Sequence, residues 1–206
     1  MSPRRDIDRM KSSTRVCAYE RAGYGRSDAG PFPRNAVRAA EELRVLLSRL
    51  ALVPPYVFAG HSLGAVHVMT MAAEHPEIVA ALLLLDPPPG VFVTGGRFTN
   101  RAKMAAEQAA EFRRTAAGAR KQNETGKAIF YETLASEHES LFGNSGEEAE
   151  DFQRFWIESN RQIAAMSSRG KFVLAKGSSH HIHRDTPDLV AREALELVAA
   201  ARGAAR

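Results

Sequence analysis

The sequence predicts an α/β fold with a mostly parallel sheet flanked by helices. Short runs that are apolar at every position alternate with segments of helical periodicity, and Gly, Pro or Asp ends most of these runs. Strands that are apolar on both faces are typical of a parallel sheet covered by helices on both sides. A length of 206 residues suits one such domain with a small insertion.

The individual elements follow in order along the chain. Apolar and β-branched runs predict strands over Arg15–Tyr19, Tyr56–Ala59, Val79–Leu85 and Lys171–Ala175. Amphipathic or Ala-rich segments predict helices over Asn35–Leu50, Ala65–Glu74, Thr99–Arg120, Glu147–Met166 and Pro187–Arg202. The segment Lys127–Leu134 fits either a strand or the start of a helix.

Composition excludes several classes of protein. Apolar residues make up 44% of the chain and charged residues 25%, which excludes a wholly disordered or collagen-like chain. The single cysteine, Cys17, excludes an internal disulfide and suits a reducing compartment. The net charge of +4 is modest, and no signal core or apolar run of membrane length is present. We therefore expect a cytoplasmic protein that binds neither nucleic acid nor membranes.

The strongest chemical motif is Gly60-His-Ser-Leu-Gly64, which matches the Gly-x-Ser-x-Gly nucleophile elbow. It lies between a predicted strand and a predicted helix, where the elbow requires it to lie. We expect a strained backbone at Ser62, with Gly60 and Gly64 letting strand and helix approach closely. The hydroxyl of Ser62 then stands at a helix N-terminus, where N–H groups favour developing negative charge.

A serine hydroxyl needs a base to take its proton, and His180 is the best-placed candidate. It follows the last predicted strand on a Gly-Ser-Ser loop, the order expected for a Ser–acid–His triad. His181 and His183 are rivals for this role. Neither a cysteine nor an acidic ligand set accompanies these histidines at a known metal spacing, so we expect no metal and no organic cofactor.

The chain resembles the α/β-hydrolase superfamily, and within it a bacterial esterase-like branch. The segments that carry the resemblance are Arg15–Asp28, Pro55–Gly64, Leu82–Pro87, Ser167–Gly170 and Gly177–Val190. The resemblance implies that Ser62 is the nucleophile, His180 the base and the Leu63 amide an oxyanion-hole donor. It also implies three parts: residues 1–93 as the first part of the α/β core, 94–150 as a helical cap and 151–206 as the last part of the core.

Three carboxylates compete for the acid of the triad. The family's spacing relative to His180 points to Asp151. If Lys127–Leu134 is the preceding strand, Glu137 takes this role instead. Asp86 follows its own strand directly and is the variant location. Asp151 is the leading candidate, and the other two stay open.

The start of the chain departs from the family pattern. Family members usually begin with further strands and a His-Gly loop that supplies a second oxyanion donor, and this chain has no His-Gly pair. Glu20 also stands where the family's loop usually has Asp. We therefore expect an N-terminally truncated fold that can self-associate through an open sheet edge.

The function expected from these features is a serine hydrolase of the carboxylesterase type acting on a small-molecule ester. The alternative is a truncated or catalytically impaired relative that serves as a non-catalytic binding or interaction protein.

Overall fold

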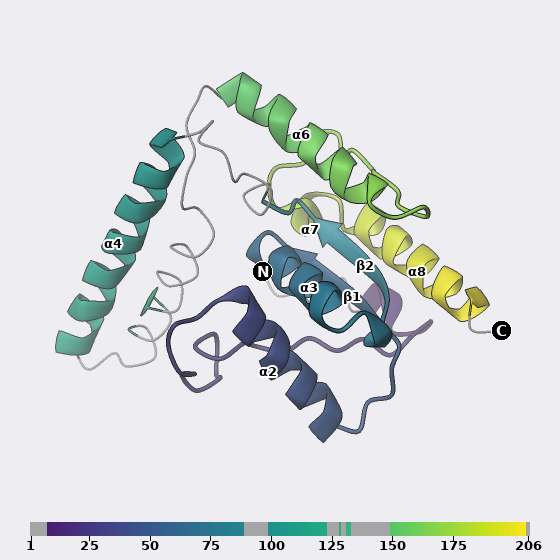
Figure 1. Cartoon of the computed structure of the whole chain (residues 1–206), viewed down its shortest axis with the longest axis horizontal. Coiled ribbons are helices and arrows are strands. Elements are labelled where there is room, and N and C mark those ends of the chain that lie inside the picture. Colours follow the sequence, from purple (N-terminus) through teal and green to yellow (C-terminus); the bar gives the residue numbers. More distant parts are fainter. Residues whose placement is uncertain (1–7, 89–98, 123–127, 129–130, 133–148, 205–206) are drawn as a thin grey trace. The chain divides into compact units, whose positions relative to one another are not determined.

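The computed structural model describes residues 8–88, 99–122, 128, 131–132 and 149–204 (Figure 1). The chain divides into two compact units. The first comprises Met1–Ala18, Ala40–Pro88 and Asn160–Arg206, and the second comprises Tyr19–Ala39 and Pro89–Ser159. In the described part of the chain, no helix combines the length and the apolar character needed to cross a membrane.

The elements of the described chain come in the order α2 (Ala36–Arg49), β1 (Tyr56–His61), α3 (Leu63–Glu74), η1 (Pro76–Ile78), β2 (Val79–Leu85), α4 (Thr99–Lys121), α6 (Ala149–Ala165), α7 (Ile182–Asp185) and α8 (Pro187–Ala204). The five predicted helices are confirmed within a few residues at each end. So are the predicted strands Tyr56–Ala59 and Val79–Leu85.

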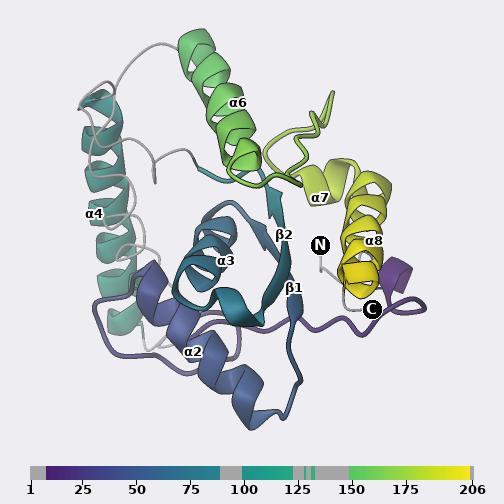
Figure 2. The same ribbon diagram turned by 45° about the vertical axis from the view of Figure 1, so that its right-hand side comes forward.

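The centre of the first unit is the parallel pair of β1 and β2. Their register places Phe58 opposite Leu82 and His61 opposite Leu85. Helices α3 and α8 lie on opposite faces of this pair (Figures 1 and 2). This covering explains why both strands are apolar along most of their length. Because the two strands are parallel, their carboxyl ends meet at one edge of the sheet, where ligand and catalytic sites of α/β sheets usually lie.

The main core of this unit lies between α2, α3 and the sheet. Its buried members are Ala40, Leu43, Phe58, Val68 and Met71. Ala40, Leu43 and the partly buried Leu47 recur at helical spacing, so one face of α2 is committed to this core. On the opposite sheet face, α8 buries Val190, Ala191 and Ala194.

Local signals explain where the helices begin. Asn35 precedes α2, and its side-chain Oδ1 accepts a hydrogen bond from the N–H of Arg38 at 2.9 Å, as an N-cap residue does. Pro187 is the first residue of α8, where its missing N–H costs nothing.

Two predicted strands are wrong. Arg15–Tyr19 and Lys171–Ala175 form no strand, and within the described residues β1 and β2 pair only with each other. The reason is that a strand is defined by a partner in a hydrogen-bonded ladder, whereas apolar and β-branched composition is only a preference for such a setting.

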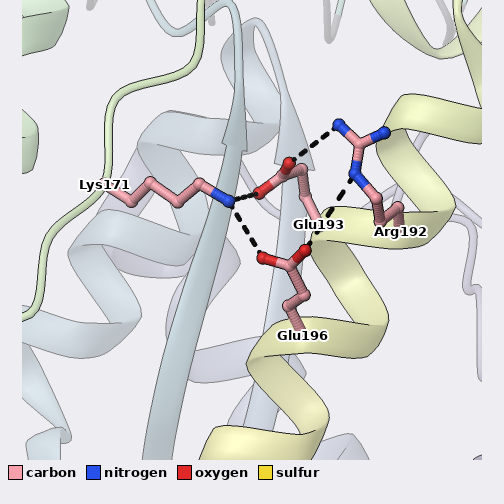
Figure 3. A network of polar contacts seen from close by, with 4 residues as sticks. All are labelled: Lys171, Arg192, Glu193 and Glu196. Carbon is pink, nitrogen blue, oxygen red and sulfur yellow. Dashed lines mark hydrogen bonds and ion pairs between the residues drawn. The ribbon is translucent and has the colours of Figure 1, made fainter.

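The segment after Lys171 is held to α8 by charge instead. Lys171 Nζ donates to Glu193 at 2.7 Å and to Glu196 at 2.9 Å, and Arg192 contacts both of these carboxylates (Figure 3). This network anchors the chain on its way to His180.

The second unit contains α4, which is one continuous helix. Ala116 and Ala119 of α4 pack with Ala128 and Tyr131. Of the ambiguous segment Lys127–Leu134, the described residues are helical, and the others lie outside the described chain. The limits 94–150 of the helical cap stay a prediction.

Glu20 organises the loop that follows it in the second unit. Its Oε2 accepts a hydrogen bond from the N–H of Arg26 at 2.8 Å, and its carbonyl accepts one from Ser27 Oγ at 2.7 Å. Gly25 has φ +56, and a Cβ there would lie 2.2 Å from the Glu20 carboxylate. The positive φ favours glycine at this turn, and a larger residue would also require the Glu20 side chain to move.

Candidate active site

Ser62 occupies a strained turn between β1 and α3. Its φ is 52° and its ψ is −124°, a left-handed region that serine rarely adopts. Its N–H donates to the carbonyl of Leu85 at 2.9 Å, and its own carbonyl accepts from the N–H of Ala65 at 2.9 Å. These bonds hold the turn at the carboxyl end of β2, as the elbow motif predicts.

The two glycines of the motif do different things. A Cβ at Gly60 would lie 2.4 Å from the carbonyl oxygen of Gly64 and 2.6 Å from the amide nitrogen of Ala65. Glycine at position 60 therefore permits the close approach of strand and helix. At Gly64 a Cβ would meet nothing within 4 Å. The expectation that both glycines serve this approach is correct for Gly60 and wrong for Gly64, because Gly64 lies in α3 with open space beside it.

His180 is paired with Asp86. The Nδ1–H of His180 donates to Asp86 Oδ2 at 2.6 Å. Asp86 directly follows β2 and has φ 47°, so it too sits in a left-handed conformation at a strand end. A carboxylate on Nδ1 fixes the tautomer in which Nε2 carries the lone pair, and a general base needs that lone pair.

His61 makes a second contact with His180, in addition to that of Asp86, and holds the loop that bears His180. Its Nε2–H donates to the main-chain carbonyl of His180 at 2.7 Å, and the two rings lie 4.6 Å apart between centroids. Partial burial lowers the pKa of His61, and the neighbouring histidines lower it further. Nothing in the sequence indicates this contact, because His61 is marked there only by its place beside Ser62.

The loop from Gly177 to Asp185 is fixed by its own polar contacts. Gly177 has φ +77, which opens the turn after the Lys171 segment. Asp185 Oδ2 accepts hydrogen bonds from the N–H and the hydroxyl of Ser179, at 2.7 and 2.6 Å. These bonds lower the pKa of Asp185. His180 is therefore held at its carbonyl by His61 and through its neighbour Ser179.

The other predicted site residues are placed as follows. Leu63 is the first residue of α3, a position where a backbone N–H has no partner within the helix, and its role as an oxyanion-hole donor stays a prediction. Asp151 lies in α6, but its side chain is outside the described residues, and so is all of Glu137. The assignment of either as the acid stays a prediction.

His181 and His183 lie beside His61, with ring centroids 5.6 and 4.6 Å away from it.

Within the described residues, no hydrogen bond joins the Ser62 hydroxyl to His180. Catalytic hydrogen bonds of this kind often tighten only when substrate is bound. The carboxyl ends of β1 and β2 thus bring together a strained serine, a histidine with an oriented ring, a carboxylate and the start of a helix. This set defines the class of a hydrolase with an α/β fold.

Comparison with known proteins agrees with this class. A family model described as the alpha/beta hydrolase fold matches residues 8–168, and the chain belongs to this family. It is 28% identical over 184 residues to the uncharacterized protein YqjL of Bacillus subtilis. This alignment covers 85% of this chain and 69% of that protein. It is 25% identical over 250 aligned positions to an AB hydrolase superfamily protein of Gibberella zeae, covering 89% of this chain and 78% of that protein.

Among solved structures, a thermophilic esterase from Thermogutta terrifontis is similar with a TM-score of 0.71. The match covers 96% of this chain and 84% of that one at 16% identity. At this identity the likeness shows the fold alone.

Proposed function

We propose that the protein is a serine hydrolase of the carboxylesterase type that acts on a small-molecule ester. Ser62 is its nucleophile, His180 its general base and Asp86 the acid of the triad. The observation that carries the proposal is the hydrogen bond of 2.6 Å between His180 Nδ1 and Asp86 Oδ2. It is made at the strand ends where Ser62 lies.

The reaction follows from the groups present. His180 Nε2 takes the proton of Ser62 Oγ as this oxygen attacks the ester carbonyl. The N–H of Leu63 donates to the oxyanion that forms. His180 then returns the proton to the departing alcohol, leaving an acyl group on Ser62. Water, activated by the same histidine, attacks this acyl group and releases the carboxylic acid.

The choice of Asp86 over Asp151 also rests on that contact. Asp86 supplies what the acid of a triad must do, since it accepts the Nδ1–H of His180 and orients the ring. The Thermogutta terrifontis esterase adds support at the level of fold only. The family contains several reactions on one scaffold, so the residues at the site carry the proposal.

The first test is covalent labelling with a fluorophosphonate. We expect the probe to modify Ser62, because such probes need an activated hydroxyl. Mass spectrometry of the digested protein identifies the labelled residue, and Ser62→Ala serves as the negative control. Labelling at another residue with Ser62 unmodified would refute the assignment.

The second arm of this test compares histidines in the hydrolysis of a short nitrophenyl ester. His180→Ala is expected to abolish hydrolysis, whereas His183→Ala retains at least about a tenth of the wild-type rate, because general-base catalysis belongs to one ring. Every assay contains a chelator, so that traces of metal ions in the buffer do not influence the measured rates. Equal loss in both variants would contradict the assignment of His180.

A further inference from the structure

Three histidines from two distant parts of the chain converge beside the candidate active site. His61 ends β1, His181 precedes α7 and His183 lies within α7. Each offers one ring nitrogen such that the three nitrogens all lie within 4.8 Å of one another. His61 and His183 meet edge to face with centroids 4.6 Å apart, and His181 and His183 do so at 6.0 Å. Such a grouping is the donor set of a transition-metal site.

Backbone geometry explains how two histidines only two positions apart face the same point. Residues at i and i+2 within a regular helix point in different directions. His181, however, is the residue before α7, with φ −91° and ψ 53°, outside the helical region. Its side chain is therefore free of the helical direction that governs His183, and both rings turn toward His61.

The hydrogen bond of His61 suits a metal ligand. Its Nε2–H donates to the carbonyl of His180, so the lone pair is on Nδ1. Metal-ligating histidines commonly donate their other ring N–H to a carbonyl or carboxylate in this way.

The spacing requires a small contraction. A tetrahedral zinc ion with Zn–N bonds of about 2.0–2.1 Å holds its nitrogens about 3.3 Å apart. The cluster, with separations of up to 4.8 Å, must therefore close by at most about 1.5 Å. His181 is exposed, so its ring can rotate without disturbing packed neighbours.

We propose that His61, His181 and His183 form a binding site for a divalent transition-metal ion, with Zn²⁺ as the preferred occupant. Three neutral imidazoles supply three positions of a tetrahedron and leave the fourth open to water or another small ligand. The proposal does not depend on Ser62 being a nucleophile, because it concerns binding alone.

The test is a titration of chelator-treated protein without a histidine tag. Calorimetry with Zn²⁺ measures stoichiometry and affinity, and visible absorption with Co²⁺ reports tetrahedral nitrogen coordination. We expect one ion per chain with micromolar affinity. His181→Ala and His183→Ala should each weaken binding about tenfold or more. His75→Ala should not change it, because His75 contacts Glu41 and Glu77 and is not one of the three clustered histidines.

The exposed His181 makes the most informative variant, since its loss should leave the fold intact. Thermal unfolding in the presence of a chelator checks this for each variant. Absence of saturable binding to the wild-type chain would overturn the proposal. Binding of equal strength in the wild type, His181→Ala and His183→Ala would overturn it as well, because the ion would then sit elsewhere.

Discussion

At the scale of single residues, backbone strain marks the ends of the two strands. Ser62 and Asp86 have φ values of 52° and 47°, and Ala51 is the third non-glycine residue with positive φ in the described chain. Each such residue costs about 1–3 kcal/mol, and such residues are found where surrounding structure enforces them. Two of the three therefore fall on the proposed nucleophile and acid.

The identity of the acid is tested at this same scale. Asp86→Asn should lower kcat by about 10⁴, because an amide at this point favours the wrong tautomer of His180. Asp151→Asn should leave kcat near the wild-type value. Steady-state hydrolysis of a nitrophenyl ester measures both variants under matched conditions. A large loss in Asp151→Asn with an active Asp86→Asn would restore the assignment made from family spacing.

At the scale of elements, the junction of β1 and α3 depends on one glycine. We expect Gly60→Ala to destabilise the fold by about 2–3 kcal/mol, because its Cβ would overlap the main chain of Gly64 and Ala65. Gly64→Ala is the matched control. It should stabilise α3 by up to about 1 kcal/mol, because alanine is the better helix former and its Cβ meets open space.

Chemical denaturation measures the free energy of unfolding of both glycine variants. The result that contradicts the structure is a loss of stability in Gly64→Ala equal to that in Gly60→Ala. In that case the two glycines would be equivalent.

The ion pairs between Lys171 and α8 also act at the scale of elements, and their contribution to stability depends on pH. Burial raises the pKa of Glu193, but hydrogen bonds from Lys171 and Arg192 outweigh this effect, and the pKa is lowered overall. Hydrogen bonds to Glu193 and Glu196 raise the pKa of Lys171. The stabilisation of the folded state by Glu193 is therefore present above the unfolded glutamate pKa and lost as pH falls. That by Lys171 is present below the unfolded lysine pKa and lost as pH rises.

We accordingly expect Lys171→Met to lower stability most between about pH 5 and pH 10. The difference from the wild type should shrink at both extremes of pH and also at high salt, since Lys171 is exposed. Thermal unfolding across this pH range provides the measurement. A difference that is constant from acid to alkaline pH would show that the ion pairs contribute nothing.

At the scale of the whole molecule, the small sheet has consequences for association. Within the described residues, β1 and β2 each have one side without a strand partner. Unpaired strand edges offer main-chain N–H and carbonyl groups to a second chain. We expect the protein to form dimers or larger species in a concentration-dependent manner. Size-exclusion chromatography with light scattering measures this directly.

Two variants that each add one positive charge sharpen this prediction. Ala59→Lys places the charge at an exposed position of β1 and should reduce association. Ala73→Lys places the same charge at an exposed position of α3 and should not. An equal effect of the two lysines would indicate that net charge, and not the strand edge, governs association.

Sequence by itself determined the five helices, the strands β1 and β2, and the place of Ser62 between strand and helix. These features depend on contacts between near neighbours: helical hydrogen bonds, caps such as Asn35, and the run of apolar residues along each strand. The family resemblance likewise pointed to the right superfamily, because the Gly-His-Ser-Leu-Gly segment and its flanking elements are continuous in the chain.

Tertiary structure alone decided which carboxylate meets His180, which apolar runs become strands, and that three histidines converge. His61 and His180 are 119 positions apart, and His180 and Asp86 are 94 apart. No local preference encodes contacts of such separation, because they arise only when β1, β2 and the loop before α7 are packed together. Arg15–Tyr19 and Lys171–Ala175 illustrate the same physics: a strand needs a ladder partner, and in the described chain neither segment has one.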